Sequence, residues 1–163
     1  MEKEEIGRVC LAIFRILLGW YFLWAFFDKM FGLGFQTPAG SGFIDGGSPS
    51  SFVIYVADGL LKDFYDSLAG NTIVDIVLLL GLLVLGVTLI LGITSKLTTF
   101  GTSLFLLVMF SLHIPPTDNP IIDHRVIMMA GMVVTYYLGG FEKLSLYEKW
   151  KELSIVKKFP ILE

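Results

Sequence analysis

The chain has 163 residues, of which 55% are hydrophobic and 17% are charged, and its mean hydropathy is +0.74. This composition is too apolar for a soluble domain of the same length, so we expect a membrane protein with a single domain spanning residues 1–163. The formal net charge of −3 provides no basic field for phosphates, which excludes nucleic acid as a partner. The single cysteine, Cys10, excludes an internal disulfide and a thiolate metal site within one chain.

Four apolar stretches have roughly the 20 residues needed to cross a membrane. The first follows the charged start MEKEEIGR and lacks a small-residue cleavage motif, so we expect a retained anchor and not a removed signal peptide. Pro115 and Pro116 separate the last two stretches. The sequence therefore predicts an all-α fold, an integral membrane four-helix bundle with spans at about 8–29, 72–93, 97–114 and 121–140.

Lysine and arginine beside the spans predict how the bundle is oriented. Most of them fall on the side that holds both chain ends, whereas Lys29, Lys62 and Arg125 fall on the other side. We therefore expect a multi-pass protein of the cell membrane whose termini are both cytoplasmic. Residues 30–71 and 115–120 should then lie outside the cell.

Two segments outside the spans show an amphipathic helical pattern. The outer one, residues 49–68, begins with Ser48 as a cap and Pro49 as the first helical residue. It is too polar to span, and it suits either an interfacial strut or a lid over the bundle. The C-terminal tail, residues 142–163, predicts an interfacial helix on the cytoplasmic face, in contact with membrane lipid.

Arg15 lies about 10 Å inside the inner boundary of the first span. A charged side chain at this depth is costly in lipid, so it should face the bundle or extend to the inner headgroups. Trp20 and Trp24 lie further along, on the helix face that ends at Asp28. Such aromatic residues fit a cleft for a ring-bearing lipid, although an interfacial belt is the default interpretation.

Ionisable residues gather at the outer end of every predicted span. If the chain runs up and down through the membrane, one face receives Asp28, Lys29, Asp75, His113, Asp123, His124 and Arg125. Unpaired charge is costly there, so these groups should pair with one another or with a ligand. Asn119-Pro120 begins the last span, and its free N–H groups would favour a small anion beside Arg125.

Three interpretations fit the two histidines, His113 and His124. As metal or haem ligands they would need further partners, and we expect no metal or haem. They could instead be structural hydrogen-bonding groups at the interface. In the third interpretation, they pass protons at a quinone head group, because an imidazole titrates near neutrality and a carboxylate can orient it.

The order of segments resembles the DoxX/DoxD-like membrane protein family. The first span reads RILLGWYFLWAFFDK, and a Gly-rich outer loop, an amphipathic helix and three further spans follow it. The resemblance covers nearly the whole chain through about Gly140, but it offers no catalytic motif to transfer residue by residue. The most similar branch is the DoxD-type subunit of thiosulfate:quinone oxidoreductase. Membership would imply electron transfer from thiosulfate to a membrane quinone, together with a smaller partner subunit.

The charged outer face and the resemblance lead to one functional hypothesis. A cationic outer pocket suits a divalent oxyanion such as thiosulfate, and the apolar bundle beneath it suits a quinone as the cofactor. In this hypothesis Arg125, His124 and Lys29 hold the anion. Protons are handled by His124, Asp123, His113 and Asp28, and the quinone is bordered by Arg15, Trp20 and Trp24.

Two other functional classes remain open. The chain could be a non-catalytic scaffold or assembly subunit of a redox complex, because the resembling family also contains assembly proteins. A small transporter is disfavoured, since the sequence shows neither an inverted repeat nor broken spans. Copurified quinone would favour the enzyme, and a copurified protein without quinone would favour the scaffold.

Overall fold

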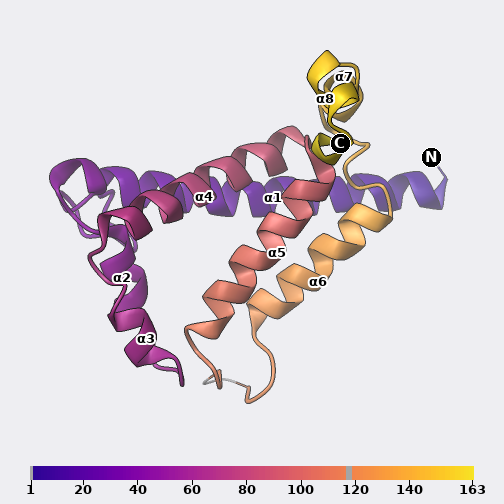
Figure 1. The fold of residues 1–163 in the computed structure, drawn as a ribbon. Coiled ribbons are helices and arrows are strands. Elements are labelled where there is room, and N and C mark those ends of the chain that lie inside the picture. The colour runs from indigo at the N-terminus through magenta and orange to yellow at the C-terminus, as the bar shows by residue number, and fades with distance from the viewer. Residues whose placement is uncertain (1, 117–118) are drawn as a thin grey trace.

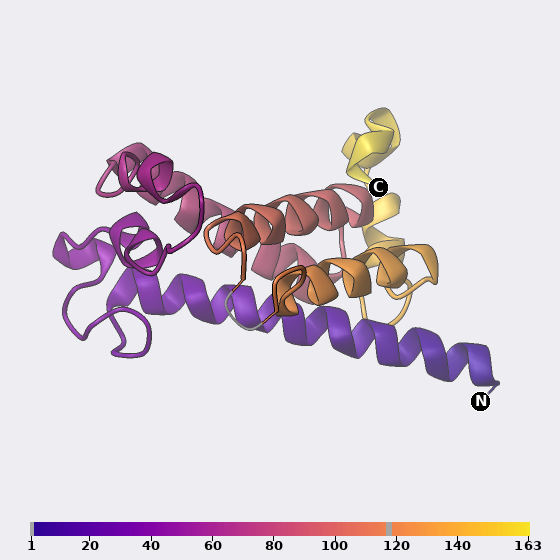
Figure 2. The same ribbon diagram turned by 90° about the horizontal axis from the view of Figure 1, so that it is seen from below.

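The computed structural model describes residues 2–116 and 119–163, and within them the chain is helical and forms no β-strand. Four helices make up the body of the molecule, and shorter helices lie at its two ends (Figure 1). The Lys3 end of α1 and the C-terminal segment lie at the same end of the molecule in Figure 1 and Figure 2. The predicted outer loop 115–120 lies partly outside the described residues, at positions 117 and 118.

The first pair of body helices is α1 (Lys3–Phe31) with α4 (Thr72–Leu91), and each is long and apolar enough to cross a membrane. Two glycines let these helices approach closely. A Cβ on Gly19 would lie 2.8 Å from the Cβ of Leu89, and one on Gly86 would lie 2.9 Å from the backbone nitrogen of Leu23. Small residues at such positions are typical of helix packing in membranes.

The second pair, α5 (Ser95–Ser111) with α6 (His124–Tyr137), lies across one side of α1 (Figure 2). These helices are shorter than the predicted spans, with 17 and 14 residues. The α6 helix begins at His124, not at 121, because the Asp123 side chain caps its first turn. At about 1.5 Å per residue, α6 measures about 21 Å, which is less than the ~30 Å of a bilayer core.

Some charged residues lie in the core of the bundle and many large apolar residues lie on its surface, in contrast to a typical soluble protein. The core contains apolar side chains such as Phe22 and Leu89, but Arg15, Asp28 and Asp75 are also almost fully buried. Meanwhile the outward faces of the helices carry large exposed apolar residues, among them Leu17, Ile73, Val77, Phe100 and Ile127. A surface this apolar over several helices is what a lipid environment requires.

The prediction of one continuous helix at 49–68 is wrong. The structure has α2 (Pro49–Tyr55) and α3 (Lys62–Asp66), separated by a turn. In that turn the N–H groups of Asp58 and Gly59 donate to the carbonyl of Leu112, which lies at the end of α5. The backbone thus pairs with another helix, and a side chain on Gly59 would collide with the backbone of Ile114.

The tail also differs from the single helix predicted for 142–163. It forms α7 (Tyr147–Lys151), α8 (Ser154–Lys158) and the 3-10 turn η2 (Pro160–Leu162). The turns fold the tail back on itself, because the indole of Trp150 donates to the carbonyl of Leu162 at 2.7 Å. Burial raises the pKa of the Tyr147 phenol, and the nearby Glu163 carboxylate raises it further.

Candidate functional site

Asp28 organises the loop that follows α1. Its buried carboxylate accepts hydrogen bonds from the backbone N–H groups of Phe35, Gln36 and Thr37 at 3.1, 3.0 and 2.8 Å. The chain reverses into this loop at Gly32, which has a φ of 59°. The loop therefore folds back over the end of α1 and brings the Gln36 side chain to Lys29.

Lys29 is the buried cation at this end of α1. Its ammonium donates to the Gln36 side-chain oxygen at 3.1 Å, and only 4% of the residue is exposed. The ammonium has more donors than this contact uses. Lys29 can therefore present charge to a ligand without losing its place in the fold.

Asp75 fixes the start of α2 against α4. Its carboxylate accepts from the Ser48 hydroxyl at 3.0 Å and from the Ser50 backbone N–H at 2.7 Å. Only 3% of Asp75 is exposed, which confirms the prediction that this carboxylate lies in the interior with protein partners. Ser48 also caps α2, because its hydroxyl accepts from the Ser51 N–H, as the sequence predicts.

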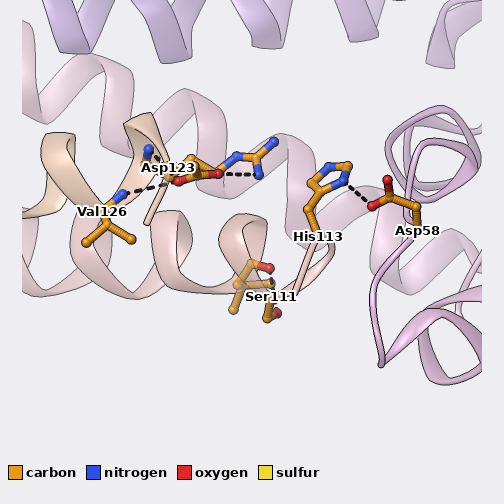
Figure 3. A network of polar contacts seen from close by, with 7 residues as sticks. Asp58, Ser111, His113, Asp123 and Val126 are labelled. Carbon is orange, nitrogen blue, oxygen red and sulfur yellow. Dashed lines mark hydrogen bonds and ion pairs between the residues drawn. The ribbon is translucent and has the colours of Figure 1, made fainter. Parts of the chain in front are cut away.

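His113 and Asp58 connect the end of α5 to the turn between α2 and α3. The His113 Nδ1 lies 2.8 Å from an Asp58 carboxylate oxygen, and Figure 3 shows the imidazole directed toward that carboxylate. The N–H of Leu60 donates to the carbonyl of Ile114 at 2.7 Å and strengthens the same connection. With Nδ1 facing Asp58, Nε2 is the ring nitrogen left for another partner.

Asp123 positions the positive residues at the start of α6. One of its oxygens accepts from the backbone N–H groups of Arg125 and Val126, and the other lies 2.9 Å from the Arg125 guanidinium (Figure 3). A guanidinium has five N–H donors, and this ion pair uses a single nitrogen of the fork. Donors of Arg125 therefore remain for a further ligand.

These elements enclose a cavity of about 350 Å³ at this end of the bundle. Its size lies within the ~300–1,000 Å³ that is usual for small-molecule sites. Its polar lining consists of Lys29, Gln36, His113, His124 and Arg125. Its apolar lining consists of Tyr21, Phe22, Ala25, Phe52, Val53, Val56, Leu78, Leu82, Phe105, Leu106, Met109, Leu112 and Met128.

The structure brings together four of the residues proposed from the sequence, because Lys29, His113, His124 and Arg125 all line the cavity. The two carboxylates proposed with them, Asp28 and Asp123, do not line it. They lie behind the cations and accept backbone N–H groups. The cavity is therefore lined by Lys29, Arg125 and the two imidazoles, while the two carboxylates hold the surrounding backbone in place.

The three residues proposed to border a quinone lie elsewhere. Trp20 and Trp24 are on the outer face of α1, with 52% and 36% of each residue exposed, and neither lines the cavity. Their rings contact each other with centroids 6.1 Å apart, and Trp24 also packs on Phe35. Both rings therefore lie away from the cavity, and the interfacial belt, the default interpretation of these residues, stays a prediction.

Arg15 lies at the other end of the bundle and is fully buried. Its guanidinium donates to five backbone carbonyls, those of Leu89, Ile90, Gly140, Lys143 and Leu144. It also lies over the Phe141 ring, 5.4 Å from the centroid. Of the two orientations considered from the sequence, the structure has the one that faces the bundle, and the side chain joins the end of α4 to the chain after α6.

Several residues of the cavity were not found from the sequence. Gln36 lies in a Gly-rich loop with no regular pattern, and Tyr21, Phe105 and Met128 read as ordinary helix residues. Met128 could have been identified from its position one turn after His124, on the helix face predicted to be internal. No local signal marks Gln36, because its position depends on the buried Asp28 carboxylate.

Metal binding receives no geometric support in the described part of the chain. Between residues 2 and 116 and from 119 onward, no three His, Cys, Asp or Glu side chains gather closely enough to hold a metal ion. The expectation of a site without metal or haem stays a prediction.

No family model, curated protein or solved structure matches the chain. The function is therefore argued from the cavity and its residues.

Proposed function

We propose that the chain is a four-span membrane protein in which α1, α4, α5 and α6 all cross the bilayer. The apolar outer surfaces of α5 and α6 support this topology, since Phe100, Leu104 and Ile127 are between 49% and 67% exposed. The turns that flank these two helices would lengthen their short spans. Reporter fusions after Ser51 and after Glu163 should give opposite signals, and equal signals would contradict the topology.

We further propose that the cavity binds a membrane quinone and a small oxyanion, and that the chain is the membrane subunit of a quinone-linked oxidoreductase. One observation carries the proposal: lysine, arginine, glutamine and two histidines line the same cavity as thirteen aromatic, aliphatic and methionine residues. A quinone ring is apolar on its faces and has carbonyl oxygens that accept hydrogen bonds. The combination of apolar walls and convergent donors suits it.

Thiosulfate is the proposed electron donor, because a divalent oxyanion needs fixed cationic donors. Two thiosulfate anions each lose one electron and join through a new S–S bond to form tetrathionate. The quinone accepts the two electrons and two protons and becomes a quinol. Lys29 and Arg125 would hold the anion, and His124 and His113 would supply the protons.

Within this proposal the buried carboxylates have a positioning role. Asp28 holds the loop that carries Gln36, and Asp123 orients the Arg125 guanidinium. Each of these carboxylates already accepts at least two hydrogen bonds from its surroundings. Trp20, Trp24 and Arg15 are not needed at the quinone.

The test uses purified protein, together with its partner subunit if one copurifies. Quinone-analogue reduction is measured with thiosulfate as the donor, and Arg125→Ala and His124→Ala should each lower the rate by about tenfold or more. Lys62→Ala is the matched control, because Lys62 is an exposed cation of α3 that pairs with Asp66 outside the cavity. The control should retain the rate.

Two results would contradict the proposal. Thiosulfate could produce no quinone reduction in a sample that contains the partner, or both cavity variants could keep the full rate. Either result would favour the alternative, a non-catalytic scaffold or assembly subunit of a redox complex. Melting temperatures of all variants should be measured, so that a loss of folding is not mistaken for a loss of chemistry.

A further inference from the structure

A second cavity of about 470 Å³ lies between α4 and α5. Apart from Ser50 and Tyr65, its lining is made of glycine and apolar residues: Val53, Ile54, Leu68, Val74, Val77, Leu78, Gly81, Val84, Leu85, Gly101, Leu104, Phe105, Val108, Met109 and Leu112. Several of these residues are also exposed on the outer surface, including Val77, Val84 and Leu104. The cavity is therefore a groove that opens sideways, on a surface that we place in the membrane.

The groove and the site cavity share a wall. Five residues line both of them, namely Val53, Leu78, Phe105, Met109 and Leu112. Among these five, the Phe105 ring also packs against the ring of Phe22, which lines the site cavity, with centroids 5.3 Å apart. The site cavity and the groove are therefore adjacent.

Two features give the groove its shape. Gly81 on α4 and Gly101 on α5 both line it, and the absence of side chains there deepens it. Near α3 the hydroxyl of Tyr65, a lining residue of the groove, forms a hydrogen bond with the Ser111 hydroxyl at the end of α5.

We propose that this groove holds the apolar tail of the same amphiphile whose polar ring occupies the site cavity. The inference rests on the proposed quinone site and adds the route by which the ligand enters from the membrane. The choice of occupant rests on adjacency, because a membrane quinone carries an apolar tail and the apolar groove shares five lining residues with the site cavity. The groove combines that shared wall with an almost wholly apolar lining.

The steric test uses Gly81→Phe. A Cβ at Gly81 would lie 3.7 Å from the Phe105 ring, which is an ordinary contact, so the new ring can extend into the groove without disturbing the helix backbone. Leu80→Phe is the matched control, since Leu80 is 54% exposed and lines neither cavity. Both variants add aromatic bulk to neighbouring positions of α4.

Binding of two quinone analogues is compared, one with a decyl tail and one without a tail. Gly81→Phe should weaken binding of the tailed analogue by about tenfold, which corresponds to about 1.4 kcal/mol of overpacking, and should leave the tailless analogue unchanged. Leu80→Phe should leave both unchanged. Unchanged binding of the tailless analogue also shows that the variant is folded.

A second measurement locates the tail directly. An analogue with a photoreactive group on its tail should label the groove side of α4 and α5, near Val84, Leu104 and Val108, and Gly81→Phe should abolish this labelling. Labelling confined to α1 or α6 would overturn the inference. Equal weakening of both analogues by Gly81→Phe would also overturn it, and so would an unchanged affinity for the tailed analogue.

Failure of the proposed function gives a different result. In that case neither analogue binds the unmodified protein, and Arg125→Ala has no binding to reduce. If both analogues bind and the tail makes no contact with the groove, the quinone site stands and the tail route is wrong. Native mass spectrometry that finds a phospholipid lost from Gly81→Phe, with tailed-analogue binding intact, would likewise assign the groove to a lipid acyl chain and overturn the inference.

Discussion

The bundle carries buried or partly buried cations at both of its ends, and it uses them in different ways. At one end the Arg15 guanidinium donates to five backbone carbonyls and has no exposed surface. At the other end Lys29 donates to one side-chain oxygen, and Arg125 forms one ion pair. Both of the latter line a cavity of about 350 Å³, whereas Arg15 lines neither this cavity nor the groove between α4 and α5.

This comparison distinguishes a cation that stabilises the fold, Arg15, from two cations that can bind a ligand, Lys29 and Arg125. A buried cation with all its donors used stabilises the fold, and its removal leaves several carbonyls without partners. A buried cation with donors to spare beside an empty volume can bind an anion or a carbonyl oxygen. The three predictions below test this comparison, beginning with the largest expected effect.

Arg15→Ala should be the most destabilising of these substitutions. It removes the group that joins the end of α4 to the chain after α6, and it leaves buried carbonyls unsatisfied. We expect a loss of at least about 3 kcal/mol in the free energy of unfolding, measured by denaturant titration in detergent. Arg15→Lys should recover only part of the loss, because an ammonium lacks the planar fork of donors.

A functional Arg15 would behave otherwise. If Arg15→Ala kept its stability and changed quinone affinity alone, the two ends of the bundle would be alike and the comparison would fail. The quinone role given to Arg15 from its sequence position would then be restored.

Asp28→Ala should have the next largest effect. The buried carboxylate accepts three backbone N–H groups, so its loss should cost about 1–3 kcal/mol and release the loop that carries Gln36. Limited proteolysis should cut the variant between residues 33 and 42 faster than the unmodified protein. Asp28→Asn, which keeps an acceptor oxygen, should be cut at an intermediate rate, and equal cutting of all three proteins would refute the anchoring role.

The gathering of Lys29, His113, His124 and Arg125 was predictable from the sequence, whereas the roles of the carboxylates near them were not. Hydropathy indicates the four helices α1, α4, α5 and α6 in their order, and the structure brings Lys29, His113 and His124 to one cavity. Nothing local reveals that Asp28 will be enclosed by the loop at 35–37, because that depends on the αL turn at Gly32. Asp28, to which the sequence analysis assigned proton transfer, therefore binds the backbone of this loop instead.

Tertiary pairing explains the errors in helix boundaries. The periodicity of 49–68 is helical throughout, yet Asp58, Gly59 and Leu60 donate to carbonyls at the end of α5. A single-sequence pattern contains no information about such a partner. In the same way Trp20 and Trp24 share a helix face with Asp28, but the cavity forms on the opposite face, beside Phe22 and Ala25.

The smallest effect is expected for Asp58→Asn, which tests the contact between His113 and the turn after α2. The Asp58 side chain is 53% exposed, so its ion pair with His113 is worth no more than about 1 kcal/mol and the melting temperature should hardly change. Its effect should instead appear in chemistry, because the carboxylate fixes which nitrogen of His113 remains for the ligand. We expect a several-fold loss in quinone-reduction rate, smaller than the loss in His113→Ala, with the pH dependence of the rate altered.

Asp66→Asn is the matched control, since Asp66 is a comparably exposed carboxylate that pairs with Lys62 away from the cavity. If Asp58→Asn and Asp66→Asn gave the same rate and pH profile, His113 would only connect α5 to the neighbouring turn, and proton supply would fall to His124 alone.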